Sequence, residues 1–175
     1  MNERTRENPN DVSKKITSNY RIQDNFLPVN LFQDLVDTLL SGGFEWYHHH
    51  DKYNDELVYF NHMFYWNYGF QSKFHNKLGA IMERLSPQAI VQIRANLFNR
   101  TVGKVKEFAP MGNYNFPHKV LLYTINANDG YTKLPDGTKI YSRDNRAVFF
   151  ETDKPYVDTS CTNDVFRMTL HFHYF

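Results

Sequence analysis

The stretch Phe116–Ile140, "FPHKVLLYTINANDGYTKLPDGTKI", says most about the fold of this chain. Its "HKVLLYTIN" segment alternates side chains with period 2 and is rich in the residues that favour β-strands. Two turn dipeptides follow, Asp129-Gly130 and Asp136-Gly137, and each has strand-like residues on both sides. Such dipeptides are typical of β-hairpins. The stretch therefore predicts a strand followed by hairpins in an antiparallel sheet.

Further strands are expected on both sides of this stretch, and two helices are expected before them. The other strand-like segments are "AIVQIRANLFNR", "RAVFFE" and the closing "DVFRMTLHFHYF". Apolar residues recur at helical spacing in "LFQDLVDTLLSGG", which Asn30 is expected to cap, and again in Ser72–Pro87. Helices followed by short antiparallel strands predict an α+β fold, with a β-sandwich or jelly roll packed on helices.

Length and composition indicate one domain inside a cell. We expect residues 1–18 to form a flexible polar arm and residues 19–175 to form a single domain. The net charge of +1 gives no electrostatic argument for a nucleic-acid or membrane partner. The single cysteine, Cys161, excludes an internal disulfide and fits a reducing compartment. No apolar run is long enough for a membrane span, and the N-terminus lacks the apolar core of a signal peptide. A cytoplasmic location is expected.

Two pairs of residues could contribute to a metal site. His49 and Asp51 are two residues apart, so on a strand both side chains would point to one face. A short histidine run in a polar loop is, however, commonly solvated surface. His171 and His173 share a strand face in the same way, but no third ligand is close to them in sequence.

The closing strand also carries Arg167, on the same expected face as Thr169, His171 and His173. The residues between them are apolar and predict a core face on the other side of the strand. An arginine among apolar neighbours needs an anionic partner. That partner is either a carboxylate of the protein or an acidic ligand held through two hydrogen bonds.

The order of these motifs resembles the 2-oxoglutarate- and Fe(II)-dependent dioxygenases of the prolyl-4-hydroxylase-like type, most closely the short members encoded by marine bacteriophages. The similarity spans about residues 20–175 and is strongest from Arg94 onward. Proteins of this family have a double-stranded β-helix, here expected with the N-terminal helices on one sheet. They bind Fe(II) through His-x-Asp and a distal His, and 2-oxoglutarate through an Arg or Lys. A phage origin would place the protein in the host-cell cytoplasm.

The family's iron ligands fall on different residue types in this chain. The resemblance aligns the His-x-Asp motif with Met111 and Asn113 and the distal His with Tyr156. A thioether, an amide and a phenol are poor substitutes for these ligands, so we expect no standard iron site. His118 opens the following strand and is not expected to replace a ligand. The resemblance also implies that Arg167 and Tyr123 contact 2-oxoglutarate or another dicarboxylate.

Three functional hypotheses follow from this combination. The first is a pseudo-oxygenase that has lost its iron ligands and binds a dicarboxylate or a protein partner. The second is an active 2-oxoglutarate-dependent hydroxylase whose relocated metal site uses His49, Asp51, His171 or His173. The third is a structural or interaction protein in which Arg167 pairs internally. The resemblance points to Fe(II) and 2-oxoglutarate as cofactors, but the residues assign neither.

Overall fold

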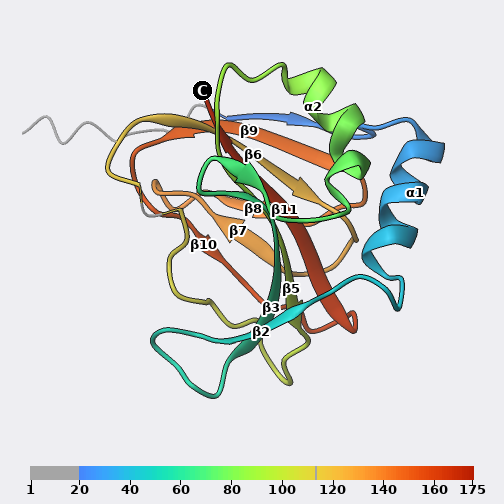
Figure 1. The fold of residues 1–175 in the computed structure, drawn as a ribbon. Helices are drawn as coiled ribbons and strands as arrows, with labels where there is room; N and C mark the ends of the chain where they lie inside the picture. Colours follow the sequence, from blue (N-terminus) through green and yellow to red (C-terminus); the bar gives the residue numbers. More distant parts are fainter. Residues whose placement is uncertain (1–19, 113) are drawn as a thin grey trace, which may run out of the picture.

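A large antiparallel sheet runs through the molecule, as the computed structural model shows for residues 20–112 and 114–175 (Figure 1). Its strand order is β1-β9-β6-β11-β5-β3-β2, and the short β4 pairs with β3. These strands are β1 (Tyr20–Gln23), β2 (Tyr47–His50), β3 (Val58–Trp66), β4 (Gly69–Phe70), β5 (Ile90–Asn99), β6 (His118–Thr124), β9 (Arg146–Thr152) and β11 (Phe166–Tyr174). The chain's last strand, β11, lies near the middle of the sheet, between β6 and β5.

A small sheet of order β10-β7-β8 completes the β-structure. Its strands are β7 (Tyr131–Lys133), β8 (Lys139–Tyr141) and β10 (Val157–Asp158). The two turn dipeptides therefore have different roles. Asp136-Gly137 lies in the predicted hairpin, between the paired strands β7 and β8. Asp129-Gly130 forms no hairpin, because β6 pairs only with β9 and β11 and the chain crosses here to the small sheet.

Both predicted helices are present but differ in detail. α1 (Val29–Leu39) starts after Pro28, which occupies the N-cap with φ of −52° and makes no side-chain cap. The prediction that Asn30 caps this helix is therefore wrong, since Asn30 already lies inside the first turn. The second helix is a 3-10 turn, η1 (His75–Leu78), continued by α2 (Gly79–Leu85). It is shorter than predicted. No helix in the described part of the chain is long and apolar enough to cross a membrane.

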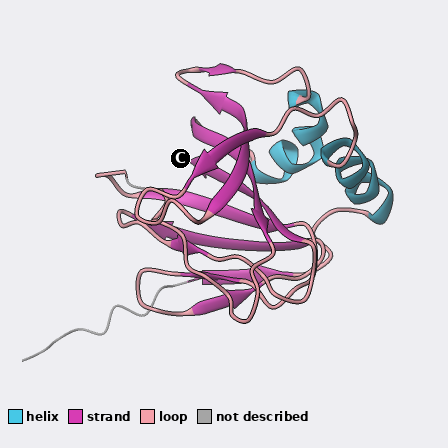
Figure 2. Ribbon diagram, turned by 90° about the horizontal axis from the view of Figure 1, so that it is seen from below, coloured by secondary structure: helices cyan, strands magenta, loops and turns pink. Residues whose placement is uncertain are grey.

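The large sheet has a hydrophobic core on each face. On one face, Leu35 and Leu39 of α1 and Ile81 of α2 pack against strand residues such as Leu170. Figure 2 shows the helices gathered on one side of the strands. On the other face, residues such as Val120 of the large sheet share a core with the small sheet. The architecture confirms the predicted jelly roll, a double-stranded β-helix with helices packed on one sheet.

Asn145 connects the N-terminal segment to the large sheet. It is buried, and its backbone lies in the left-handed region with φ of 52°. Its side chain accepts a hydrogen bond from the Leu27 amide (2.8 Å) and donates one to the Leu27 carbonyl (2.8 Å). Its backbone carbonyl accepts from the Phe26 amide (3.0 Å). The Tyr123 hydroxyl donates to the same side-chain oxygen (2.6 Å). One residue thus fixes the entry to α1.

We expect Asn145→Ala to lower the free energy of unfolding by about 2–4 kcal/mol, because buried amide groups of Leu27 lose their partners. Tyr123→Phe removes a single hydroxyl and should cost only about 0.5–1.5 kcal/mol. Urea unfolding monitored by tryptophan fluorescence measures both values. Equal losses in the two variants would contradict this ranking.

Candidate functional site

The inward face of β11 contains the residues that the sequence grouped together. Arg167, Thr169, His171 and His173 are fully buried on the face that looks toward the small sheet. Phe166, Met168, Leu170, Phe172 and Tyr174 belong to or pack against the core on the helix side. The predicted alternation is therefore present. The polar side faces the interior of the barrel and not solvent.

Four hydrogen bonds hold Arg167 inside the described part of the protein. Its Nη1 donates to Asp158 Oδ1 (3.0 Å) and to the Thr159 carbonyl (3.2 Å). Its Nε donates to Ser142 Oγ (2.7 Å), and its Nη2 donates to Thr132 Oγ1 (2.7 Å). Both members of the ion pair with Asp158 are completely buried. Of the two partners considered for Arg167, the structure contains a carboxylate of the protein.

The charge of Asp158 is maintained by its neighbours. Burial alone would raise the pKa of this carboxyl, but the neighbouring positive charge, of which Arg167 is the permanent part, more than offsets burial and lowers it below its usual range. Arg167 carries a permanent charge, so it keeps Asp158 ionised whatever the state of His171. The result is a buried ion pair with no net charge, which connects the large sheet to β10.

Two of the three positions aligned with the iron ligands are joined to each other. Met111 and Tyr156 form an isolated antiparallel bridge, with N–H···O distances of 2.7 and 3.0 Å. The third, Asn113, lies outside the described residues. At Gly112 an added Cβ would come within 2.8 Å of a Tyr156 ring carbon and 3.0 Å of a His173 ring carbon. The loop therefore packs directly on these rings and leaves no room between them.

Tyr156 lies at the centre of a buried chain of hydrogen bonds. Its hydroxyl is 2.7 Å from His171 Nδ1 and 3.1 Å from His173 Nε2. His173 Nδ1 is 2.9 Å from His118 Nε2, and His118 Nδ1 is 3.0 Å from the Phe116 carbonyl. The chain thus connects the small sheet, β11 and the start of β6.

The Phe116 carbonyl determines which atom donates and which accepts in each of these hydrogen bonds. A carbonyl only accepts, so His118 Nδ1 must donate, and the Nε2 of a neutral His118 must then accept from His173 Nδ1. The Tyr156 hydroxyl donates in turn to His173 and accepts from His171 Nδ1. This leaves His171 Nε2 as an acceptor.

The end of the chain at His171 explains an unsatisfied oxygen. Thr169 Oγ1 lies 3.0 Å from His171 Nε2 and can donate to it. Asp158 Oδ2 is also 3.0 Å from this nitrogen, yet it has no hydrogen-bond partner among the described residues. A neutral His171 has no second proton to give it. With the imidazoles neutral, every ring nitrogen in this series of hydrogen bonds has a partner. Asp158 Oδ2 is left without one.

Burial keeps His171, His173 and Tyr156 uncharged. It lowers the pKa of His171 despite Asp158, and it lowers the pKa of His173 well below the ordinary value. Burial also raises the pKa of the Tyr156 phenol well above its ordinary value. Around neutral pH the interior accordingly contains a phenol and imidazoles, and no phenolate.

The structure does not bring the remaining predicted site residues to Arg167. Tyr123 pairs in register with Leu170, so it lies on the helix side of the sheet and bonds Asn145. It therefore faces away from Arg167, because Arg167 is three residues from Leu170 on β11 and side chains an odd number of residues apart on a strand point to opposite faces. The expectation that Tyr123 lines a pocket with Arg167 does not match this arrangement.

The His49 and Asp51 pair also lies away from Arg167. Asp51 Oδ1 accepts from the Tyr53 and Asn54 amides (2.9 and 3.1 Å), and Oδ2 accepts from the Ala109 amide. His49 stacks on Tyr59. Asp51 thus fixes two loops. Within residues 20–112 and 114–175, no group of three or more His, Cys, Asp and Glu side chains is placed to hold a metal ion.

The described residues therefore do not fit Fe(II) or 2-oxoglutarate at the aligned positions. The Met111 thioether and the neutral Tyr156 phenol are poor iron donors, and the phenol is already bonded to imidazoles. Each nitrogen of the Arg167 guanidinium that would hold the cosubstrate already donates a hydrogen bond within the protein. Sequence reasoning missed Asp158, Ser142 and Thr132 as its partners, because no local pattern indicates a contact between separate strands.

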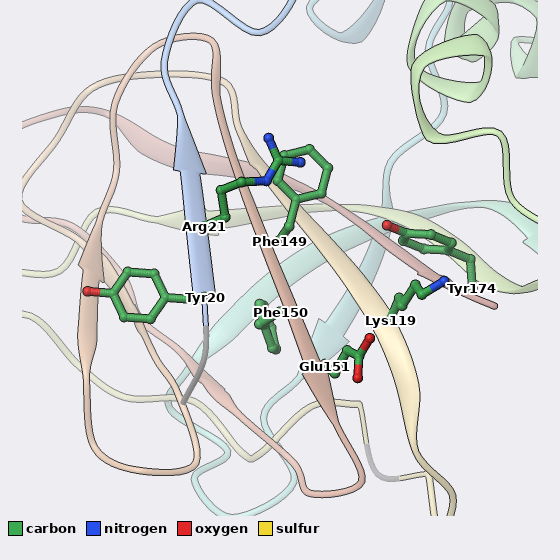
Figure 3. A pocket seen from close by; sticks show the side chains of 7 residues that line it. All are labelled: Tyr20, Arg21, Lys119, Phe149, Phe150, Glu151 and Tyr174. Carbon is green, nitrogen blue, oxygen red and sulfur yellow. The ribbon is translucent and has the colours of Figure 1, made fainter. Parts of the chain in front are cut away.

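Hollows lie around this filled interior. One pocket of about 370 Å³ is lined by Arg94, Gln92 and Met111 among others, and it shares Trp66 and Tyr114 with an aromatic groove of about 590 Å³. A third hollow lies mainly on the helix side of the sheet, where Arg21 covers the ring of Phe149 at 4.0 Å (Figure 3). The first two flank the loop that contains Met111 and define what we call the mouth of the barrel.

Comparison with known proteins shows a fold and no close relative. No protein-family model and no curated protein matches the sequence. A viral collagen prolyl hydroxylase from Paramecium Bursaria Chlorella virus-1 is similar in structure, with a TM-score of 0.59 and 11% identity over 88% of this chain and 93% of that one. A Pseudomonas putida prolyl-4-hydroxylase has a TM-score of 0.56 and 12% identity over 90% and 92%.

A third similar structure is a Trichoplax adhaerens prolyl hydroxylase in complex with a peptide fragment of hypoxia inducible factor. Its TM-score is 0.58, with 11% identity over 90% of this chain and 84% of that one. The chain therefore has the fold of the 2-oxoglutarate/Fe(II) oxygenases.

The buried ion pair predicts an asymmetric response to mutation. Arg167→Met should lower the free energy of unfolding by about 3–5 kcal/mol, because it leaves the Asp158 carboxylate buried without a counter-charge. Adding Asp158→Asn should recover part of this loss. Lys73→Met, which removes an exposed ion pair with Glu45, is the matched control and should leave stability nearly unchanged. Chemical denaturation compares the variants, and a double variant less stable than Arg167→Met would refute the explanation.

The buried histidines predict a loss of stability in mild acid. The folded pKa values of His171 and His173 lie below that of an unfolded histidine, so below pH about 6.5 the unfolded chain binds more protons. Their contribution is complete above that pH and falls by up to about 1.4 kcal/mol per pH unit and residue as the pH decreases. Urea midpoints at several pH values between neutral and mildly acidic measure the slope. His173→Gln should flatten it, whereas His48→Gln on the exposed β2 should not.

Proposed function

We propose that this protein is a pseudo-oxygenase. It keeps the oxygenase fold, neither binds iron at the aligned positions nor turns over 2-oxoglutarate, and works by binding a protein or peptide partner. The observation that carries the proposal is the position of Tyr156. Its buried hydroxyl is bonded to His171 and His173, and its backbone is bridged to Met111.

The state of Arg167 supports the same proposal. A dicarboxylate bound there would have to displace Asp158, a buried carboxylate that already makes the charge-assisted bond. The displaced Asp158 would then be buried beside a second anion, at a cost of several kcal/mol. A dicarboxylate at Arg167 is therefore disfavoured, which leaves the mouth of the barrel as the binding surface.

The chemistry of the mouth suits a peptide. Trp66, Tyr68, Tyr114, Phe116 and Phe175 line the larger groove, and aromatic rings of this kind are enriched in protein recognition surfaces. Trp66, Tyr68 and Phe175 are exposed in the structure. One of the similar oxygenase structures is in complex with a peptide fragment. By analogy, we propose the same class of partner here, bound without hydroxylation.

The alternative of an active hydroxylase with a relocated metal site has less support. Its candidate ligands do not converge, since Asp51 is used by backbone amides and His171 and His173 are bonded to Tyr156. A metal ion would have to break the buried hydrogen-bond chain before it gained these two imidazoles.

Metal titration provides the test. We expect isothermal titration of the purified protein with Mn(II), with and without 2-oxoglutarate, to show no binding tighter than about millimolar, because the donor set is wrong for hard divalent ions. Incubation with Fe(II), ascorbate and 2-oxoglutarate should release no succinate above the level without protein. Metal-dependent 2-oxoglutarate binding together with succinate release would overturn the proposal.

A variant with the family's ligands is the matched control. Met111→His, Asn113→Asp and Tyr156→His together should bind Mn(II) at least about tenfold more tightly than the natural chain, since imidazole and carboxylate are suitable ligands. The same variant should still fail to bind 2-oxoglutarate, because Asp158 continues to occupy Arg167. If this variant binds the metal but not 2-oxoglutarate, the absence of metal binding and the absence of 2-oxoglutarate binding in the natural chain have separate causes.

A further inference from the structure

Arg94 occupies a position between the barrel interior and its mouth. It lies on β5 opposite His171 in the strand register, and its neighbours on the same face are Gln92 and Asn96. Arg94 and Gln92 both line the pocket of about 370 Å³. The guanidinium is thus held by a central strand of the large sheet, at a rigid position beside a hollow.

Two nitrogens of this guanidinium have no partner. Nε and Nη2 of Arg94 are shielded from solvent and make no hydrogen bond to any described residue. Together these atoms form the side-on fork that fits both oxygens of a carboxylate. An acceptor for these two N–H groups would stabilise the charged fork.

Arg146 of the same chain shows the arrangement that Arg94 lacks. Its Nε donates to Asp24 Oδ1 (2.6 Å) and its Nη2 to Asp24 Oδ2 (2.9 Å). Arg167 likewise has partners on Nε and Nη2. Among these three arginines, Arg94 is the one whose Nε and Nη2 have no hydrogen-bond partner in the described chain.

The pocket does not supply the missing anion from the described chain. Asp51 is its acidic lining residue, and both of its oxygens already accept backbone amide hydrogens. Lys52 adds a second positive charge to the lining. An anion entering the pocket therefore meets a surface with more positive than negative charge.

Much of the remaining lining of the pocket is apolar or aromatic, although His50 also contributes to it. Tyr59, Trp66, Tyr114 and Met111 line it, and through Trp66 and Tyr114 it shares walls with the aromatic groove. A small inorganic anion would leave these walls uncovered. A ligand with a carboxylate at one end and an apolar or aromatic group at the other would satisfy both parts.

We infer that Arg94 is the anchor of a binding site for a carboxylate attached to an aromatic or apolar group. A carboxylate that enters beside Arg94 and displaces the protein atoms covering Nε and Nη2 accepts hydrogen bonds from both nitrogens, and the apolar part packs on Trp66 and Tyr114. Its source is a free organic acid or the carboxyl end of a peptide. This inference deepens the proposed binding function and rests on it. The metal titration uses no such ligand, so the two proposals can fail separately.

Calorimetric titration of the full chain with 3-phenylpropionate and with 3-phenylpropionamide tests the site. We expect the acid to bind in the millimolar range or tighter, and the neutral amide at least about tenfold more weakly. Arg94→Gln should weaken binding of the acid by a similar factor. Arg94→Lys should weaken it too, because lysine lacks the planar fork. Arg21→Gln, in the separate hollow of Figure 3, is the control and should leave the affinity unchanged.

A peptide distinguishes the two sources. Gly-Gly-Gly-Phe with a free C-terminus should bind more tightly than 3-phenylpropionate if a peptide end is the natural ligand, and more weakly if a free acid is. Equal affinity for acid and amide, no binding of either, or unchanged affinity in a folded Arg94→Gln variant would overturn the inference. Circular dichroism verifies folding, and the comparison of acid with amide on the natural chain needs no variant.

Discussion

The buried pair of Arg167 and Asp158 is the contact on which the interior of this protein depends. Arg167 comes from a central strand of the large sheet and Asp158 from the small sheet, so the pair joins the two layers of the barrel. Thr132 and Ser142 complete the coordination of the guanidinium from β7 and from the residue after β8. Gly130 packs so closely on Arg167 that an added Cβ would lie 2.5 Å from Arg167 Cδ. The crossover between the sheets is thus built around this side chain.

The rest of the interior follows from that arrangement. With Asp158 fixed beside Arg167, His171 lies next to a carboxylate but is kept neutral by burial, and it bonds Tyr156 and Thr169 instead. From Tyr156 the hydrogen bonds continue through His173 to His118, and the Phe116 carbonyl sets the order of donors and acceptors. Polar groups fill this part of the barrel and most of them bond one another, although Asp158 Oδ2 has no hydrogen-bond partner among the described residues. Arg94, just outside this network, is a charged group whose buried Nε and Nη2 have no partner in the described chain.

Much of the fold could be predicted from the sequence, and the reasons are local. The alternation along "DVFRMTLHFHYF" separates a core face from a polar face, and the apolar spacing in residues 31–40 marks α1. Pro28 displaced the expected cap because it is itself placed to start the helix. The hairpin predicted at Asp129-Gly130 is wrong, because a turn dipeptide does not determine which strands pair on either side of it.

The site was less predictable, because its contacts join residues far apart in the chain. The need of Arg167 for an anion was visible in sequence, but its choice of Asp158 depends on how the two sheets face each other. Tyr123 was assigned to the wrong side of the sheet by a resemblance that does not fix register. His118 could be set aside as a ligand, but its role beside His173 required the structure. Nothing local marks Arg94 as unpaired.

The bridge between Met111 and Tyr156 has a consequence for protein engineering. Replacing either residue by a metal ligand would remove a packed or hydrogen-bonded side chain before any metal could bind. Freeing Arg167 for a ligand carboxylate would need a further change at Asp158, which now pairs with it. Each such substitution would first reduce the stability of the chain. A metal site at these positions would therefore require several substitutions at the same time.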